Sequence, residues 1–177
     1  RLSTNNLTLI FVGRLVYQKG IDRVLHLLAI NKNIELIVIG EGDFKVDLLK
    51  KVKHLNIEDK VKFLGKILKP YNLIAGADYF ILPSRWEGLP NCVLESLALG
   101  TPVLSTKQIY SLIDFKKNIS NSSIVLFNSI RELSKKINIL EKRKDYRKPK
   151  LRKSLLIDYI SPINFNKKIN KIILKIA

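Results

Sequence analysis

Apolar runs and helical patterns alternate along the first two thirds of the chain. Leu7–Val12 and Ile34–Ile39 are mostly apolar runs with the length of a buried strand. Between them, four apolar residues recur at the spacing of one helix face: Ile21, Val24, Leu25 and Leu28. This alternation is typical of βαβ units, so it predicts an α/β fold in which a parallel sheet has helices on both faces.

The same alternation continues beyond the second predicted strand. Helices are predicted from Asp43 as an N-cap, over residues 71–75, and from Pro90 to a C-cap at Gly100. Further strands are expected at 61–64, 79–82, 103–104 and 123–127.

Glycine and polar residues follow each predicted strand at the point where it ends. The carboxyl ends of parallel strands lie along one edge of the sheet, and open sheets of this kind bind ligands there. We therefore expect the site at this edge. The residues concerned are Gly13-Arg14, Gly40-Glu41-Gly42, Gly65-Lys66, 84–87 and Ser105-Thr106.

Two cations, Arg14 and Lys19, lie on the loop after the first predicted strand, beside Gly13 and Gly20. Such a pair can neutralise a diphosphate, because arginine offers a planar fork, lysine a point charge, and glycine lets the backbone approach. In so basic a chain they are equally explained as ordinary surface residues.

Two carboxylates, Glu87 and Glu95, bracket the start of the helix predicted from Pro90. Ionised carboxylates accept strong hydrogen bonds from sugar or ribose hydroxyls, and the unpaired amides of a helix start suit phosphate. The alternative is one surface glutamate and one glutamate that caps the helix.

Composition limits the kinds of site that the chain can form. One Cys and two His among 177 residues exclude a disulfide framework and a Cys/His metal cluster. The lack of Met predicts a fragment of a longer protein, and no apolar run approaches the ~20 residues that span a bilayer. The net charge of +17 would attract polyanions, although Lys, Ile and Asn are abundant throughout, which favours a general compositional bias.

Several short blocks occur in the order and at the spacing of one known family. The blocks are FVGRL at 11–15 with Lys19-Gly20, VIGEG at 38–42, FLG at 63–65, Ala77-Asp78, LPSRWEGLPN at 82–91 with Glu95-Ser96, and GTPV at 100–103. They resemble the carboxyl-terminal, donor-binding domain of family 4 glycosyltransferases. The resemblance covers about residues 7–106 and implies a Rossmann-like domain, one half of a two-domain GT-B fold, whose amino-terminal acceptor domain lies outside this chain.

The resemblance also implies an activity. Enzymes of this family are retaining glycosyltransferases, so we expect a UDP- or GDP-sugar donor and a glycan or lipid-linked acceptor, in bacterial surface polysaccharide synthesis. No cofactor and no obligatory metal are implied. The implied mechanism is same-face transfer, in which the leaving phosphate helps to deprotonate the acceptor, and not a covalent carboxylate route. Without the acceptor half the chain is expected to be inactive.

Residue roles follow from the same resemblance. Arg14 and Lys19, beside Gly13, would hold the diphosphate and stabilise its growing negative charge, which is a catalytic role. Glu87 would act at the donor sugar, also as a catalytic residue, and Glu95 would bind the ribose hydroxyls. Further donor contacts are implied for Leu89, Pro90 and Asn91 near the phosphates and for Phe63, Leu64, Gly65 and Lys66 beside the base.

The chain departs from the family pattern after the fifth predicted strand. Residues 105–110 lack the Gly pair and Glu that the family commonly has there, which removes the usual basis for donor-sugar contacts from this loop. A nucleotide-sugar epimerase of the same fold is one alternative. A dinucleotide-binding redox enzyme is disfavoured, because the third glycine of its fingerprint would fall at Lys45.

Residues 135–153 differ from the rest, with ten Lys or Arg against Glu141 and Asp145. We interpret them as a basic linker inside a nucleotide-sugar-binding domain of residues 1–160, with a closing amphipathic helix over 161–177. The alternative is a basic module for an anionic membrane or, less favoured, for nucleic acid, since each Lys or Arg near an acidic membrane contributes ~1 kcal/mol. We therefore expect a cytoplasmic location, which becomes peripheral on the inner face of the plasma membrane if this segment docks there.

Overall fold

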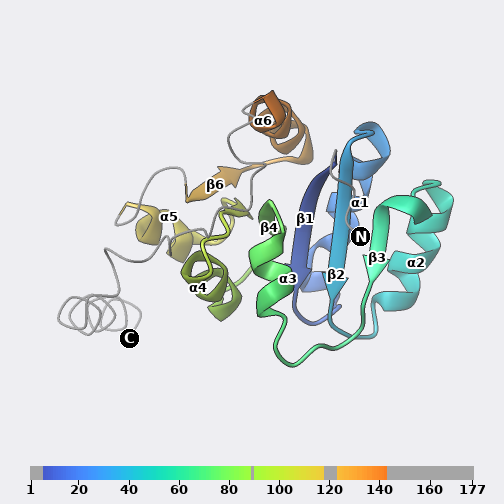
Figure 1. Cartoon of the computed structure of the whole chain (residues 1–177), viewed down its shortest axis with the longest axis horizontal. Helices are drawn as coiled ribbons and strands as arrows, with labels where there is room; N and C mark the ends of the chain where they lie inside the picture. Colours follow the sequence, from blue (N-terminus) through green and yellow to red (C-terminus); the bar gives the residue numbers. More distant parts are fainter. Residues whose placement is uncertain (1–5, 89, 118–122, 143–177) are drawn as a thin grey trace.

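The described residues form one sheet of six strands, with a helix between each strand and the next (Figure 1). The structure is a computed structural model and describes residues 6–88, 90–117 and 123–142. The strands are β1 (Leu7–Val12), β2 (Ile34–Ile39), β3 (Val61–Phe63), β4 (Tyr79–Leu82), β5 (Val103–Thr106) and β6 (Ile124–Phe127). The helices are α1 (Ile21–Ile30), α2 (Lys45–His54), α3 (Tyr71–Gly76), α4 (Asn91–Ala98), α5 (Tyr110–Lys116) and α6 (Ile130–Lys142), with 3-10 turns η1 (Tyr17–Lys19) and η2 (Glu58–Lys60).

The strand order is β3-β2-β1-β4-β5-β6, and each neighbouring pair is parallel. The order reverses between β1 and β4, where Leu9 pairs with Tyr79 and Ile10 with Phe80. Helices leave these two strands toward opposite faces of the sheet, so their following loops diverge and leave room for a ligand. The switch point between β1 and β4 is therefore where this fold places a site.

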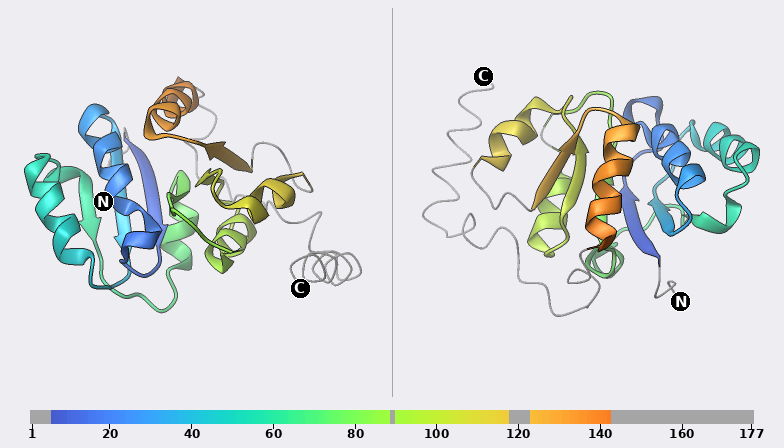
Figure 2. Two further views of the ribbon diagram at one scale, coloured as in Figure 1. Left: turned by 180° about the vertical axis from the view of Figure 1, so that it is seen from behind. Right: turned by 90° about the horizontal axis from the view of Figure 1, so that it is seen from above.

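Helices cover both faces of the sheet (Figure 2), as the sequence predicts. α1, α2 and α6 pack on one face, where Phe11 and Val38 belong to the same buried cluster as Leu25. α3, α4 and α5 pack on the other face, where Ile10 contributes to a second cluster. Because both sides of β1 and β2 are buried, these strands have apolar residues at consecutive positions without a polar alternation.

Two predicted boundaries need correction at the strand ends. Leu64 was expected inside the third strand but lies just beyond β3. Ser105 and Thr106 were expected in the loop after the fifth strand, but they belong to β5 and are buried. Their backbones pair with Leu126 and Phe127 of β6, and this ladder extends β5 beyond its apolar residues.

The start of α2 was also predicted wrongly. Phe44, and not Asp43, stands at the N-cap, and no side chain caps the helix. The Phe44 amide donates to the carbonyl of Leu15 at 3.0 Å, and Lys45 donates to Gly42 at 3.0 Å. Backbone contacts with the loop after β1 therefore fix the entry to this helix. At α4, Pro90 is the N-cap, and Gly100, at φ +78, follows the C-cap residue Leu99.

The first part of the basic segment is a helix and not a linker. α6 includes residues 135–142 and packs beside α1 (Figure 2). Leu133 and Ile137 are fully buried, one turn apart, and Lys136 donates to the carbonyl of Leu126 at 2.6 Å. The rest of the basic segment and the predicted closing helix at 161–177 lie outside the described residues.

Candidate functional site

The loops after β1 and β4 meet at the switch point of the sheet. Gly20 lies in the left-handed region at φ +67, and a Cβ atom at this position would collide with the carbonyl oxygen of Pro83. The Arg85 amide donates to Gln18 O at 2.8 Å, and Gln18 Nε2 donates to Trp86 O at 2.9 Å. Close backbone approach thus joins the two loops at the predicted edge.

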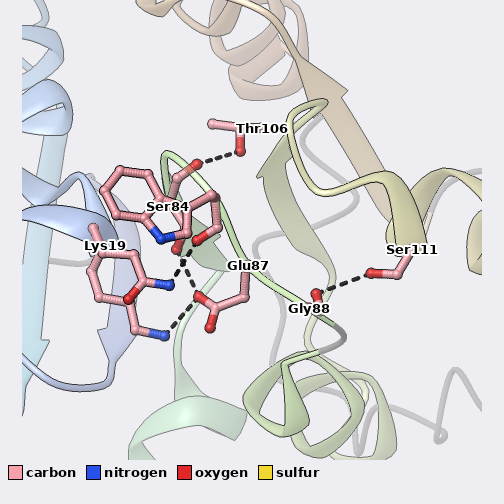
Figure 3. Close-up of polar contacts among 8 residues, drawn as sticks. Lys19, Ser84, Glu87, Gly88, Thr106 and Ser111 are labelled. Carbon is pink, nitrogen blue, oxygen red and sulfur yellow. Dashed lines mark hydrogen bonds and ion pairs between the residues drawn. The ribbon is translucent and has the colours of Figure 1, made fainter. Parts of the chain in front are cut away.

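Lys19 and Glu87 face each other across this junction (Figure 3). Lys19 Nζ lies 2.7 Å from Glu87 Oε2, and the two side chains are only 13% and 15% exposed. Ser84 Oγ donates to the same carboxylate oxygen at 3.1 Å. Because both charges are largely shielded from water, their attraction is stronger than that of an open surface pair.

The loop after β4 is also attached on its other side. Thr106 Oγ1 donates to Ser84 O at 2.8 Å, and Ser111 Oγ donates to Gly88 O at 3.0 Å (Figure 3). Thr106 ends β5, and Ser111 lies in the first turn of α5. The loop that carries Glu87 is therefore held between β1 and β5 and does not project alone into solvent.

The second predicted carboxylate, Glu95, lies on α4, the helix that follows the Glu87 loop. Burial raises the pKa of the Cys92 thiol to about 11; the Lys19 charge acts to lower this pKa, and Glu87 and Glu95 act to raise it. All three charges therefore act on the thiol of Cys92, the second residue of α4. Glu95 itself is exposed, on the fifth residue of α4.

The Arg14 side chain makes fewer contacts than that of Lys19. Gly13 donates to Ile39 O at 3.0 Å, and the Lys19 side chain passes beside Gly13, whose added Cβ would lie 3.9 Å from Lys19 Cε. Arg14 follows on the same loop and is exposed, and its side chain makes no hydrogen bond or ion pair within the described part of the chain. It is thus available to a ligand at this edge.

The segment predicted to border a base begins at Phe63, the last residue of β3, and continues beyond this strand, two strands away from β1. Phe63 packs partly against the core, whereas Leu64 is 44% exposed and Lys66 is exposed. The Leu64 amide donates to Val38 O at 2.9 Å, and Gly40 donates to Gly65 O at 2.8 Å. The segment lies on the same edge of the sheet as the switch point, but it makes none of the contacts that join the loops after β1 and β4.

The structure thus brings Lys19 and Glu87 into direct contact, with Arg14 on the loop after β1 and Glu95 on α4. Pro90 caps α4 and Asn91 begins it, while Leu89 lies outside the described residues. The sequence placed Ser84, Arg85 and Thr106 at this edge without indicating their contacts. It did not single out the other residues that join the loops: Gln18, Asp22, Arg23 and Ser111. Apart from the bond between Ser84 and Glu87, these contacts join residues more than 20 positions apart, so no local pattern could have identified them.

The described residues contain neither a cluster of metal ligands nor a helix that could span a membrane. No group of three or more His, Cys, Asp or Glu in residues 6–88, 90–117 and 123–142 is arranged to hold a metal ion. In the same ranges no helix has the length and apolar character needed to cross a membrane.

Comparisons with known proteins agree on one family. Residues 1–155 match the model of the family described as glycosyl transferases group 1. Over 98 residues, 54% of this chain and 26% of the relative, the chain is 38% identical to an N-acetylgalactosamine-N,N'-diacetylbacillosaminyl-diphospho-undecaprenol 4-alpha-N-acetylgalactosaminyltransferase of Campylobacter jejuni.

Two solved structures show the same fold. Anabaena HepE in complex with UDP-glucose superposes with a TM-score of 0.76 at 20% identity, over 97% of this chain and 49% of HepE. The carboxyl-terminal domain of the group 1 glycosyltransferase LpcC from Francisella tularensis superposes with a TM-score of 0.63 at 23% identity, over 85% of this chain and 84% of that domain. The chain spans about half the length of HepE and has the Rossmann-like fold of one half of a GT-B enzyme. With its six-stranded parallel sheet and the family match over residues 1–155, the chain belongs to the group 1 glycosyltransferases.

Proposed function

We propose that this chain is the carboxyl-terminal, donor-binding domain of a retaining, family 4 glycosyltransferase. It binds a UDP- or GDP-sugar at the switch point between β1 and β4. The observation that carries this proposal is the ion pair of Lys19 and Glu87 at 2.7 Å, which is largely shielded from water at the switch point, with Glu95 on the helix that follows. One end of this group suits a diphosphate and the other suits hydroxyls. HepE, a structural neighbour, was solved with UDP-glucose, and the LpcC domain covers nearly the same length of chain.

The diphosphate binds to Lys19 and Arg14 in this proposal. Lys19 exchanges Glu87 for a phosphate oxygen when the donor enters, and Arg14 adds a second cation from the adjoining loop. Pro90 has no N–H, so the amide donors at this end come from Asn91 and Cys92, the first two residues of α4, whose amides have no partner within the helix. Gly13 lets the backbone approach the phosphates.

Release of Glu87 from Lys19 leaves its carboxylate beside the donor sugar, where it accepts hydrogen bonds from sugar hydroxyls. Glu95, on the exposed side of α4, accepts hydrogen bonds from the ribose hydroxyls. As the sugar departs, negative charge grows on the diphosphate, and Lys19 and Arg14 stabilise that charge without any need for a metal ion. The leaving phosphate takes the proton of the acceptor on the same face of the sugar, which gives retention.

The base lies toward β3 in this proposal. Phe63, Leu64, Gly65 and Lys66 occupy the same edge of the sheet at the distance of two strands from β1. Exposed Leu64 offers an apolar contact to a base, and Lys66 offers a donor for its carbonyl oxygens.

The acceptor is a glycan or a lipid-linked glycan, bound by an amino-terminal domain beyond this chain. The name of the Campylobacter relative describes transfer to a diphospho-undecaprenol-linked sugar. This supports an acceptor of the same kind and a role in bacterial surface polysaccharide synthesis. The proposed location is the cytoplasm, beside the inner face of the plasma membrane. Co-sedimentation with anionic vesicles at low and high salt tests the peripheral location, and lack of binding at low salt contradicts it.

Isothermal titration of the folded chain with UDP, GDP and ADP tests the proposed function. UDP or GDP should bind, with the same affinity in the presence of a chelator, because no obligatory metal is involved. Lys19→Ala serves as the matched control and should bind more weakly. Lack of binding by all three nucleotides contradicts the proposal. Binding that requires a divalent metal contradicts its metal-independent form.

A nucleotide-sugar epimerase of the same fold makes a different prediction. Such an enzyme would interconvert the free donor without an acceptor. Incubation of the complete enzyme with UDP-sugars alone, followed by separation of the sugars, distinguishes the two activities. An epimerised donor in the absence of acceptor contradicts the transferase proposal.

A further inference from the structure

Arg85 joins the loop after β4 to the loop after β1. Its Nη1 and Nη2 atoms donate to Asp22 Oδ1 and Oδ2 at 2.9 and 2.7 Å. Nη1 also donates to Tyr17 O at 2.6 Å, and the guanidinium carbon lies 3.7 Å from the centre of the Tyr17 ring, which is a cation–π contact. One side chain thus fixes Tyr17 and Asp22, which stand on either side of Lys19 in the sequence.

The geometry of this contact is specific to arginine. A planar guanidinium can make two parallel hydrogen bonds to a carboxylate and stack on a ring at the same time, whereas lysine is a point charge. Burial would raise the pKa of Asp22, but the hydrogen bonds and charge of Arg85 outweigh burial and lower that pKa below its usual value. The side chains of Arg85 and Asp22 are 19% and 14% exposed, so water competes little for this pair.

The contact lies directly beside the Lys19–Glu87 pair. Arg85 is two residues from Glu87, and its backbone amide donates to Gln18 O, next to Lys19. The two core clusters on either side of the sheet include none of these residues. Loss of the contact should therefore loosen the loop that carries Lys19 more than it unfolds the domain.

We propose that Arg85 and Asp22 are positioning residues for the donor diphosphate. They hold Lys19 in place opposite Glu87 before the ligand arrives, and neither touches the ligand. Preorganisation of this kind strengthens binding because the loop has no further ordering to undergo. The inference rests on the proposed function and adds a part of the site that lies behind the ligand-contacting residues.

A double-mutant cycle tests the proposal by titration with UDP, or with GDP if only GDP binds the parent chain. Arg85→Ala should weaken binding about tenfold in the parent, as should Asp22→Asn, because the loop must then order on binding. In a Lys19→Ala background, Arg85→Ala should change the affinity less than about twofold, because the group that it positions is gone. Equal effects in both backgrounds, or no effect in the parent, overturn the proposal.

Two variants separate positioning from stability. Glu132→Ala removes the ion pair with Lys136 inside α6, at 2.7 Å, and should lower the melting temperature without changing nucleotide affinity. Arg85→Lys keeps the charge and loses the fork, so it should bind between the parent and Arg85→Ala, and it replaces Arg85→Ala in the cycle if that variant does not fold. If affinity follows the melting temperature across all these variants, the proposal is wrong.

Amide hydrogen exchange keeps the inference testable if no nucleotide binds and the proposed function itself fails. In Arg85→Ala, the amides of Lys19 and Gly20 should exchange at least about tenfold faster, while Ile37 in β2 should keep its rate. These two loop amides donate to Val16 O and Tyr17 O at 3.0 and 3.1 Å. Unchanged exchange at both amides shows that Arg85 does not hold the loop and overturns the proposal.

Discussion

The loops after β1 and β4 differ from the loop after β3, although all three lie on one edge of the sheet. The first two share an ion pair between Lys19 and Glu87 and direct backbone hydrogen bonds, and Arg85 of the loop after β4 also pairs with Asp22 in the first turn of α1. In the loop after β3, Lys66, Leu68 and Lys69 are exposed, Leu68 to 85%, while Ile67 packs partly against the core. The end of the site assigned to the diphosphate is therefore preorganised by contacts between two loops. The end assigned to the base has no comparable side-chain contacts among the described residues.

This difference suggests a division of tasks. A diphosphate is common to all nucleotide-sugar donors, so a rigid site for it serves any of them. The base varies between donors, and an exposed loop can change its side chains without disturbing the sheet.

The largest effect is expected at Gly20, where the two connected loops meet. Gly20→Ala should cost about 3 kcal/mol in the free energy of unfolding, because a left-handed backbone and a collision with the Pro83 carbonyl act together. Denaturant titration measures this. Gly76→Ala is the matched control, since an added Cβ there meets nothing within 4 Å, and it should change stability by less than about 1 kcal/mol. Equal costs at both glycines would remove the evidence that the junction is tight.

The second effect concerns the two cations. Lys19→Ala and Arg14→Ala should each weaken binding of the nucleoside diphosphate by about 1.5 to 3 kcal/mol, the range for a hydrogen bond to a charged group. Calorimetric titration gives both values. Lys50→Ala, on the exposed side of α2, is a charge-matched control that should bind like the parent. Parental affinity in both Lys19→Ala and Arg14→Ala would disprove the phosphate assignment.

The third effect is the pH dependence of the connected loops. Asp22 has a lowered pKa in the fold, so its stabilising contribution is complete above its ordinary value of 3.8 and is lost as the pH falls below that value. Asp22→Asn should therefore cost about 1 kcal/mol of unfolding free energy at pH 7, a figure reduced for partial exposure. The cost should shrink toward zero in acid. A cost that does not change with pH would mean that the charge of Asp22 is unimportant.

The smallest effect is expected in the loop after β3. Lys66→Ala and Leu64→Ala should leave binding of inorganic pyrophosphate unchanged and should weaken nucleoside diphosphate binding by less than about 1 kcal/mol each. Competition between the two ligands in one titration series measures both quantities. A large loss of pyrophosphate binding in either variant would show that the contrast between the loops is wrong.

The sheet could be predicted from the sequence because its signal is local. Each strand in the centre is buried on both sides, so apolar runs such as Ile34–Ile39 mark it directly. α6 was missed because its lysines hide a narrow apolar stripe, of which Leu133 and Ile137 are the buried members. The cap at Asp43 was wrong because the entry to α2 depends on the distant carbonyl of Leu15.

The candidate site could be predicted only in part, for the same reason. Lys19, Glu87 and Glu95 stand out because they follow strand ends or lie near the start of a helix, and the structure pairs the first two directly. Arg85 and Asp22 lie 63 residues apart, and neither position carries a local signal of its partner. Contacts of this kind depend on the crossing of the chain between β1 and β4, which no periodicity encodes. The roles of these residues toward a donor stay predictions.

A crystal structure of the chain with UDP tests the central claim most directly. We expect the pyrophosphate within hydrogen-bonding distance of Lys19 Nζ, beside the first amides of α4, with the Glu87 carboxylate moved off Lys19 and the Arg85–Asp22 pair unchanged. UDP bound away from the junction of β1 and β4, with Lys19 still paired to Glu87, would contradict it.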